Sequence, residues 1–319
     1  MEEMIKMNKT TGSQVTEFIL MGITNRPELQ DALFVVFFLN YMVIALGNLG
    51  LIILISIDSH LKTPMYFFLR HLAFVDLGYS TAIGPKMLVN FIEEKNIISY
   101  VGCATQQVFF GIFITSEIFI LSVMAYDRYM AICKPLLYTV IMSEMVCWLL
   151  VFISYLYSTI VSLLVTIMTF KSSFCKSNVL RHFYCDVLPL LSITCSDTRN
   201  IDLIIMVSAA FELVSSLLII FISYMFILVT ILRMKSSEGR HKAFSTCGSH
   251  FFGVMIFYAT LVFMYMQPQS NHSFDTDKTA SVFYTLVIPM LNPLIYSLRN
   301  KAVKGALRRG LGNSTILVS

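Results

Sequence analysis

Charged side chains are scarce in this sequence. Asp, Glu, Lys and Arg together make up only 13% of the 319 residues, about half of the roughly 25% that is usual in soluble domains. The net charge of +4 is too small to indicate a nucleic-acid partner. Because hydrophobic residues reach 56% of the chain, the composition excludes a disordered chain and a collagen-like fibre, and it disfavours a water-soluble enzyme. It indicates a membrane protein.

Processing and metal-binding motifs are also missing. Charged side chains interrupt the first thirty residues, which therefore contain no apolar segment of the kind found in a cleavable signal peptide. The first apolar stretch is then expected to act as signal and anchor together. No C-x-x-C pair or Cys/His cluster has zinc-ligand spacing, and neither an H-E-x-x-H nor a paired-Asp motif occurs. These absences disfavour a metal centre and an intramembrane enzyme.

Seven stretches are apolar and long enough to cross a bilayer. About 20 apolar residues span the hydrocarbon core, and the lack of water there forces such segments to be helical. Pro85 is expected to interrupt the second stretch. The predicted fold class is therefore an all-α membrane protein, a seven-transmembrane helix bundle. The expected spans are 32–57, 65–92, 101–132, 145–170, 201–232, 243–267 and 280–298.

Lys and Arg predict the orientation, because cytoplasmic loops carry an excess of these residues. With the N-terminus outside, the inner segments hold most of the bases, and the short outer loops hold only Lys86, Lys95 and Lys278. The N-terminal tail and the long loop over 171–202 also hold bases, but acids outnumber them there. The expected parts are an extracellular tail at 1–31, a transmembrane domain at 32–298 and a cytoplasmic tail at 299–319.

Both ends carry a motif that agrees with this orientation. Asn8-Lys9-Thr10 is an N-glycosylation sequon, and glycosylation of Asn8 requires the lumenal side.

The segment 299–309 has five bases and no acid, and its apolar residues Val303, Ala306 and Leu307 recur at helical spacing. It predicts a short amphipathic helix held at the inner leaflet by anionic membrane lipid. A disordered basic tail is the alternative.

Cysteines are divided between the two sides. In an oxidising compartment four cysteines allow three pairings, and free thiols are the alternative. Two disulfides would fold the long outer loop over the mouth of the bundle. The four of the seven cysteines that lie outside under this topology are Cys103, Cys175, Cys185 and Cys195.

Five motifs follow one another along the chain. They are PMYFFL at 64–69, MAYDRYMAICKP at 124–135, Ser-Tyr at 223–224, KAFSTCGSH at 242–250 and PMLNPLIYSLRN at 289–300. With these motifs in this order, the chain resembles the olfactory receptors, in their tetrapod-type class, which are rhodopsin-like G-protein-coupled receptors. The departures are small: Met130 replaces the usual Val, and Ala259 replaces the last residue of the common FYG.

The resemblance implies a function and its partners. It implies an odorant receptor in the plasma membrane that binds a small volatile ligand and activates the olfactory stimulatory G protein, raising cAMP. It implies no enzymatic activity, and it implies the disulfides Cys103–Cys185 and Cys175–Cys195. A chemosensory receptor for a metabolite outside the nose is one alternative. A transporter or channel is another, although the sequence shows no inverted repeat.

The inner ends of the spans carry a predicted G-protein switch. Asp127 is expected to hold Arg128 at rest and to release it when the bundle opens. Pro293 removes a helix hydrogen bond, so a kink near Asn292 would let Tyr296 swing inward. Interfacial anchoring, a core histidine and a purely structural kink are the alternatives. The predicted switch residues are Asp127, Arg128, Tyr129, Tyr224, His250, Asn292, Pro293 and Tyr296.

The ligand is expected in the outer half of the bundle. Four residues of the third span form one helical stripe that ends at Ile118. The site is mostly apolar with a few hydroxyls, which suits a small, weakly polar molecule; ordinary helix packing is the alternative. No acid stands at the level of Phe110, which disfavours cationic amines. The predicted ligand-binding residues are Gln107, Phe110, Gly111, Ile114, Thr115, Ser208, Glu212, Tyr258, Leu261, Tyr265, Val282 and Thr285.

Asp76 and Glu117 lie deep in apolar spans, where a carboxylate is costly and needs a partner. Two neighbouring acids cannot both stay charged unless a cation neutralises them or one is protonated. The resemblance points to a structural Na⁺ at Asp76 and Glu117, and Ser122 and Asn292 are expected to supply further oxygens. A proton shared between the two acids is the alternative.

Overall fold

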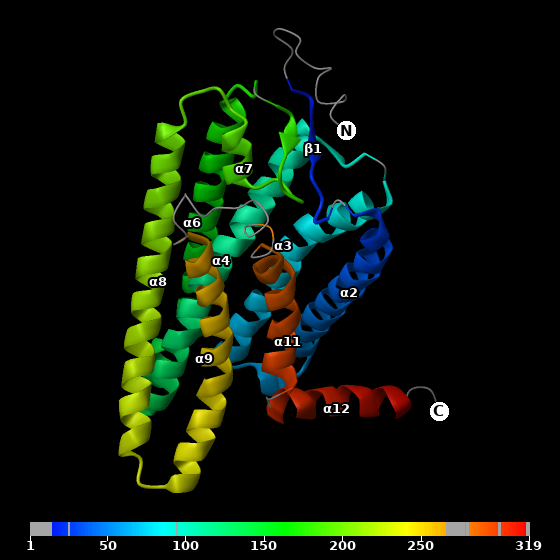
Figure 1. Cartoon of the computed structure of the whole chain (residues 1–319). Helices are drawn as coiled ribbons and strands as arrows, with labels where there is room; N and C mark the ends of the chain where they lie inside the picture. The colour runs from blue at the N-terminus through cyan, green and yellow to red at the C-terminus, as the bar shows by residue number, and fades with distance from the viewer. Residues whose placement is uncertain are drawn as a thin grey trace.

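The structure is a computed structural model that describes residues 15–24, 26–93, 95–175, 177–265, 278, 281–298 and 301–316. Within these ranges the chain is mostly helical, and Figure 1 shows its long helices gathered in one bundle. The predicted glycosylation site Asn8 lies outside the described residues, as do the side chains of Tyr265 and Tyr296.

Long helices occupy the seven apolar stretches, and the seventh stretch contains a π-helical segment, η3. Proline in the first turn starts α2 and α3, because its missing N–H would be unpaired there anyway. Among the described helices, α2, α4, α6 and α8 are long and apolar enough to cross a membrane. The bounds are α2 Pro27–Ile57, α3 Pro64–Ile92, α4 Tyr100–Cys133, α6 Glu144–Lys171, α8 Arg199–Arg233, α9 Ser237–Tyr265, η3 Phe283–Val287 and α11 Ile288–Leu298.

Pro85 does not interrupt the second apolar stretch, which corrects the prediction. It lies inside α3, which continues on both sides. Neighbouring helices can satisfy backbone groups around a proline in a membrane bundle. Here the Gln106 side chain of α4 donates from Nε2 to the Ala82 carbonyl at 2.9 Å, in the turn before Pro85.

The central helix is α4, which packs against α3, α6 and α8. Its contact with α6 depends on Gly111. A Cβ at this position would lie 2.5 Å from the Ser162 Oγ, and that hydroxyl donates to the Val108 carbonyl at 2.8 Å. Gly111 therefore faces α6, and its missing side chain allows the two helices to approach closely.

A small sheet covers one end of the bundle, which we call the outer end. Its strands are β1 (Glu17–Leu20), β2 (Ile97–Ser99) and β3 (Val179–Leu180), in the order β2-β1-β3. β1 runs antiparallel to β2 and parallel to β3. Phe18 of β1 is fully buried and packs edge-on against Phe174. The predicted tail 1–31 thus contains a packed strand and the start of α2, because Phe18 finds an aromatic pocket that only the fold creates.

Two disulfides join the outer segments. Cys103, near the start of α4, is bonded to Cys185, and Cys175 is bonded to Cys195; the Cα–Cα distances are 5.5 and 5.9 Å. The Cys185 backbone N–H also donates to Gln106 Oε1 at 2.9 Å. These are the pairings that the family resemblance implies.

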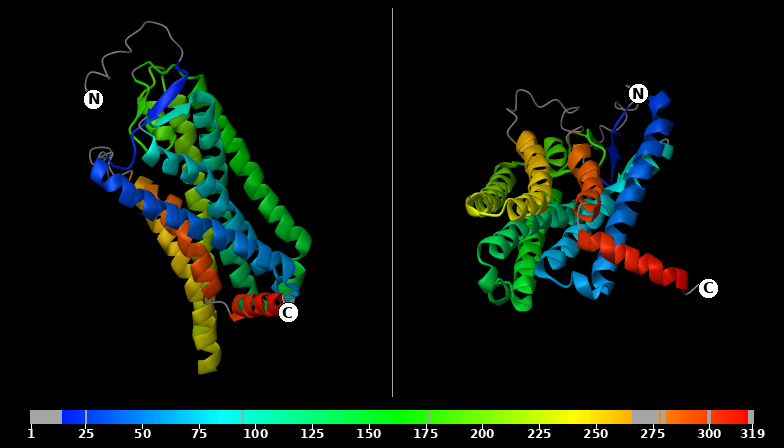
Figure 2. Two further views of the ribbon diagram at one scale, coloured as in Figure 1. Left: turned by 90° about the vertical axis from the view of Figure 1, so that its right-hand side faces the viewer. Right: turned by 90° about the horizontal axis from the view of Figure 1, so that it is seen from below.

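The inner end, opposite the sheet, carries η1 (Ser59–Leu61), α5 (Pro135–Ile141) and α12 (Lys301–Ile316). Figures 1 and 2 show α12 turning away from α11 across this end. Arg309 donates from Nε and Nη2 to Asp58 Oδ2 at 3.1 and 2.7 Å, which holds the pKa of Asp58 below its usual value. Val303 and Ala306 are buried, whereas Leu307 is 52% exposed. Of the predicted apolar face of α12, Val303 and Ala306 thus pack against the protein, and Leu307 does not.

The disulfide Cys103–Cys185 generates a first prediction. Losing a disulfide costs about 2–5 kcal/mol in small secreted domains, enough to impair export of a marginal membrane protein. Cys103→Ser and Cys185→Ser should lower surface expression to a similar level, and the double variant should be no lower, because one bond is lost in each case. Flow cytometry of an epitope-tagged receptor measures this. A double variant whose loss equals the sum of the two single losses would contradict the pairing.

The contact at Gly111 generates a second prediction. In Gly111→Ala the new Cβ would press on Ser162, and such overpacking costs about 1–3 kcal/mol. The detergent-solubilised variant should therefore unfold at a lower temperature. Gly50→Ala is the matched control, because a Cβ there has no neighbour within 4 Å. Equal unfolding temperatures for the two variants would show that α4 and α6 are not in close contact at Gly111.

Candidate functional site

The structure brings most of the predicted ligand-binding residues to the interior of the outer half. Seven of them have side chains that are less than 10% exposed, and Ser208, Ile114 and Val282 are half-buried. They come from α4, α8, α9 and the seventh stretch. The seven are Gln107, Phe110, Thr115, Glu212, Tyr258, Leu261 and Thr285.

Polar contacts tie this region together across helices. The Tyr258 hydroxyl of α9 donates to the Ile118 carbonyl of α4 at 3.2 Å. The Glu212 carboxyl group of α8 lies near the hydroxyls of Thr115 in α4 and Tyr157 in α6. Tyr157 was not predicted, because its side chain is one of many aromatics on an apolar helix and nothing in the sequence marks its partner.

Gln107 differs from its neighbour Gln106. Gln106 uses both atoms of its amide, as donor to Ala82 and as acceptor from Cys185. Gln107 is only 6% exposed, yet within the described part of the chain neither its Nε2 nor its Oε1 has a hydrogen-bond partner. Buried polar groups are normally paired. A donor and an acceptor are thus offered to a molecule that enters this region.

Three predicted ligand-binding residues contact groups of the protein itself. Gly111 faces Ser162 of α6 and not the bundle interior, which corrects its assignment to the ligand-facing stripe. The rotation from Gln107 to Gly111 is about 40° around the helix, enough to reach the neighbouring helix. Ser208 and Thr285 donate to backbone carbonyls of their own helices at 3.1 and 2.6 Å. The region therefore offers fewer free hydroxyls than predicted.

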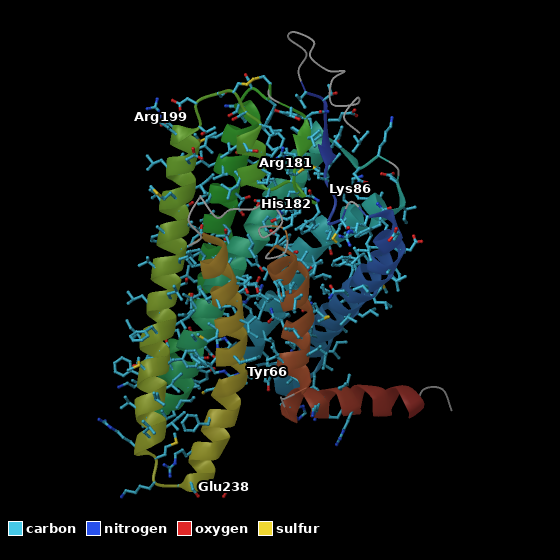
Figure 3. The ribbon with its side chains drawn as sticks, in the orientation of Figure 1. Tyr66, Lys86, Arg181, His182, Arg199 and Glu238 are labelled. Carbon is cyan, nitrogen blue, oxygen red and sulfur yellow. A yellow bond between two sulfur atoms is a disulfide. The ribbon has the colours of Figure 1, made fainter. Side chains whose placement is uncertain are left out.

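The long outer loop closes over this region. Tyr184 contacts the Phe110 ring, with centroids 5.1 Å apart. Figure 3 shows His182 at the outer end. Its Nε2 lies 3.2 Å from the Ser281 Oγ. Burial, together with the nearby charge of Lys278, lowers the pKa of His182 to about 3. His182 is therefore neutral at physiological pH. Sequence reasoning missed it, because a histidine in a loop gives no signal of burial.

Below this region lies the predicted acid pair. Asp76 and Glu117 are fully buried, and the Asn292 side chain lies within hydrogen-bond distance of both. Asn292 of α11 donates from Nδ2 to both Asp76 oxygens at 3.2 and 3.0 Å and lies 3.4 Å from Glu117 Oε1. The Tyr79 hydroxyl, which was not predicted, donates to Asp76 Oδ1 at 3.3 Å. Ser122 donates to the Phe119 carbonyl at 2.8 Å, and its oxygen as a further ligand of the ion stays a prediction.

At the inner end of α4, Asp127 has a partner that was not predicted. The Tyr138 hydroxyl of α5 donates to Asp127 Oδ1 at 2.8 Å and reaches it from the neighbouring helix. Among the described residues no ion pair joins Asp127 to Arg128. That Asp127 holds Arg128 at rest stays a prediction.

The other switch residues lie at the inner half. Tyr224 of α8 and His250 of α9 are joined by a 2.5 Å contact between the Tyr hydroxyl and the His Nδ1. Tyr129 lies against the Phe226 ring, with centroids 5.6 Å apart. Pro293 lies inside α11, which continues on both sides. One hydrogen bond thus joins the inner halves of α8 and α9.

Comparison with known proteins agrees with this arrangement. The family described as olfactory receptor matches residues 37–313. The chain is 66% identical to human olfactory receptor 8K3 over 94% of this chain and 96% of that protein. It is 63% identical to human olfactory receptor 8K1 over 98% of each, and 59% identical to mouse olfactory receptor 8U3 over 94% of each. The resemblance found from the motifs is confirmed: the chain belongs to the olfactory receptors, a non-enzymatic family of membrane receptors that sense odorants through a G protein.

Proposed function

We propose that this receptor binds a small, mostly apolar odorant in the outer half of its bundle and activates the olfactory stimulatory G protein, raising cAMP. One observation carries the proposal. The single helix α4 holds Gln107, buried with an unpaired amide, and also holds Asp127 and Arg128 at its other end. A ligand that contacts the outer half of α4 therefore acts on the helix that presents the switch residues.

The proposed membrane arrangement has seven spans in the plasma membrane, with the N-terminus outside. Two features support it. Both disulfides lie at the end that would face the oxidising exterior. The basic helix α12 lies at the opposite end, where anionic lipid of the inner leaflet would hold it. The proposed parts are the extracellular tail 1–31, the transmembrane domain 32–298 and the cytoplasmic tail 299–319.

The proposed ligand is neutral and weakly polar. Phe110, Ile118 and Leu261 supply apolar contacts, and the Gln107 amide supplies one donor and one acceptor. The Glu212 carboxyl group lies near the hydroxyls of Thr115 and Tyr157, so a cationic amine would compete with these hydroxyls for it. A hydroxyl or carbonyl compound of low polarity fits these groups best.

The proposed switch lies between α8 and α9. Tyr258 links α9 to α4 beside the proposed ligand site, and the contact from Tyr224 to His250 links α9 to α8 at the inner half. A ligand that binds better to a state with α9 displaced will shift the population toward it. Separation of Tyr224 from His250 would then open the inner end and expose Arg128 to the G protein.

We also propose that Asp76 and Glu117 hold Na⁺. Two neighbouring buried carboxyl groups cannot both be ionised unless one is protonated or a cation lies beside them, and a cation can take the place of that proton. Glu117 Oε2 is buried and has no partner among the described residues, so an oxygen is left to bind an ion. The bound ion would offset one of the two negative charges, while Tyr79 and Asn292 orient the carboxyl groups.

The switch proposal predicts that Arg128→Ala abolishes ligand-evoked cAMP, because the cation that faces the G protein is lost. Agonists come from a cAMP-reporter screen of a chemically broad volatile library, and variants are compared at matched surface level. Arg233→Ala is the control, since it removes an exposed base from the inner end of α8 and should retain signalling. Unchanged signalling in Arg128→Ala would rule out the switch. Responses that persist without the G protein would indicate a channel or transporter.

The ion proposal predicts a dependence on Na⁺. An ion that binds the resting state lowers basal activity and stabilises the fold by mass action. Replacing Na⁺ with choline at constant pH and ionic strength should therefore raise basal cAMP and lower the unfolding temperature of the wild-type receptor. In Glu117→Gln, basal cAMP and the unfolding temperature should not change when choline replaces Na⁺. If neither quantity changes in the wild-type receptor, the two acids share a proton and bind no ion.

A further inference from the structure

The two disulfides of the outer end differ in their exposure. Cys103 and Cys185 are both 0% exposed, and they belong to a buried cluster that also contains Phe18 of β1. Cys175 and Cys195 are both exposed. Attack on a disulfide requires access to one of its sulfur atoms. A reagent in the surrounding medium can therefore reach the second bond, whereas the first bond is covered.

The surface around the exposed disulfide faces water and not lipid. Ser196, which follows Cys195, is exposed. A little further along, Arg199 Nη2 lies 2.9 Å from Asp197 Oδ2, and these two side chains are 89% and 62% exposed. Charged side chains with this exposure are costly in hydrocarbon. Figure 3 shows Arg199 at the outer end, so the bond lies where water-borne molecules reach it.

Hydrogen bonds hold the two segments together beside this disulfide. The Cys195 N–H donates to the Ser173 carbonyl at 2.9 Å, and the Ser173 N–H donates to the Ser196 Oγ at 2.9 Å. Phe174 and Thr194 form an antiparallel bridge between them. None of these contacts involves a sulfur atom. The two cysteines would therefore stay close together after the bond between them opened.

We propose that the Cys175–Cys195 disulfide is an exchange site for small thiols dissolved in the water at the outer end. The thiolate of the small molecule forms a bond to one sulfur atom of the pair, and the bond between the two cysteines breaks. The other cysteine leaves as a thiolate and takes up the proton that the small thiol has lost. The product is a mixed disulfide, and the step involves no net oxidation or reduction.

The exchange would be reversible. The freed cysteine stays beside the modified one, so its thiolate can attack the mixed disulfide and expel the small thiol. The amount of adduct therefore follows the concentration of thiol in the medium. While the adduct exists, the segment that carries α7 (Val187–Ser192) loses its connection to the end of α6 through Cys195 and keeps the one to α4 through Cys185. This inference does not depend on where the odorant binds.

Peptide mass spectrometry of the purified full-length receptor in nanodiscs tests the site, with reduced glutathione as the probe. The reaction is stopped with acid, because the adduct is transient, and free thiols are then capped with N-ethylmaleimide. Adducts on Cys175 or Cys195 should exceed those on Cys103 or Cys185 by on the order of tenfold, because only the first two are exposed. The buried pair is thus the internal control.

The pH dependence tests the chemistry of the step. The thiolate is the attacking species, and a thiol with a pKa of about 8.5 has about eightfold more thiolate at pH 8 than at pH 7. The initial rate of adduct formation should rise by the same factor. A rate that does not change between these two values would contradict attack by a thiolate.

The alternatives have separate outcomes. Absence of adduct from both exposed cysteines, or equal adduct on all four, would overturn the proposal. Reaction with propanethiol but not with glutathione would place the bond in an apolar pocket, and would also overturn it. The double variant with Cys175→Ser and Cys195→Ser should form no adduct, and adduct at the wild-type level would mean that the site lies elsewhere. If this variant does not fold, the comparison of the four cysteines within the wild-type receptor still decides.

Discussion

The position of α4 is the constraint on which the rest of the structure depends. Its outer end is fixed to the long loop by the bond from Cys103 to Cys185. Further along, the missing side chain of Gly111 allows α6 to pack closely against it. The same helix then carries Glu117 into the buried acid cluster and Asp127 to the inner end. Because these groups share one helix, their relative depths are set by its rise per residue.

Buried polar groups differ in whether the described residues satisfy them. Ser158 and Ser216 donate to carbonyls one turn earlier in their own helices, at 2.7 and 2.6 Å. Such bonds satisfy a hydroxyl without any neighbour. Gln107 and Asn90 are different: among the buried side-chain amides of the described residues, these two have neither atom paired. An unpaired buried amide is costly, so the ligand that we propose at Gln107 would satisfy groups that the described residues leave unpaired.

Much of the fold could be predicted from the sequence, because a bilayer permits few structures. Apolar runs placed the long helices within a few residues of their bounds, with the largest shift at α9, which begins at Ser237. The motifs also indicated the family correctly, because several short motifs in a fixed order rarely occur together by chance. β1 was missed, because Phe18 is buried only when β2, β3 and the aromatic rings near Phe174 are assembled around it.

The sequence by itself determined the apolar helices, the positions of the buried acids and the family. Only the tertiary structure decided which groups meet. It gave Asp127 the hydroxyl of Tyr138 as a partner, added Tyr79 to the acid cluster and turned Gly111 toward α6. The physical reason is that hydropathy is a property of each segment, readable along the chain, whereas a hydrogen bond depends on the rotation and depth of two helices relative to each other. That relation is fixed by packing across the whole bundle.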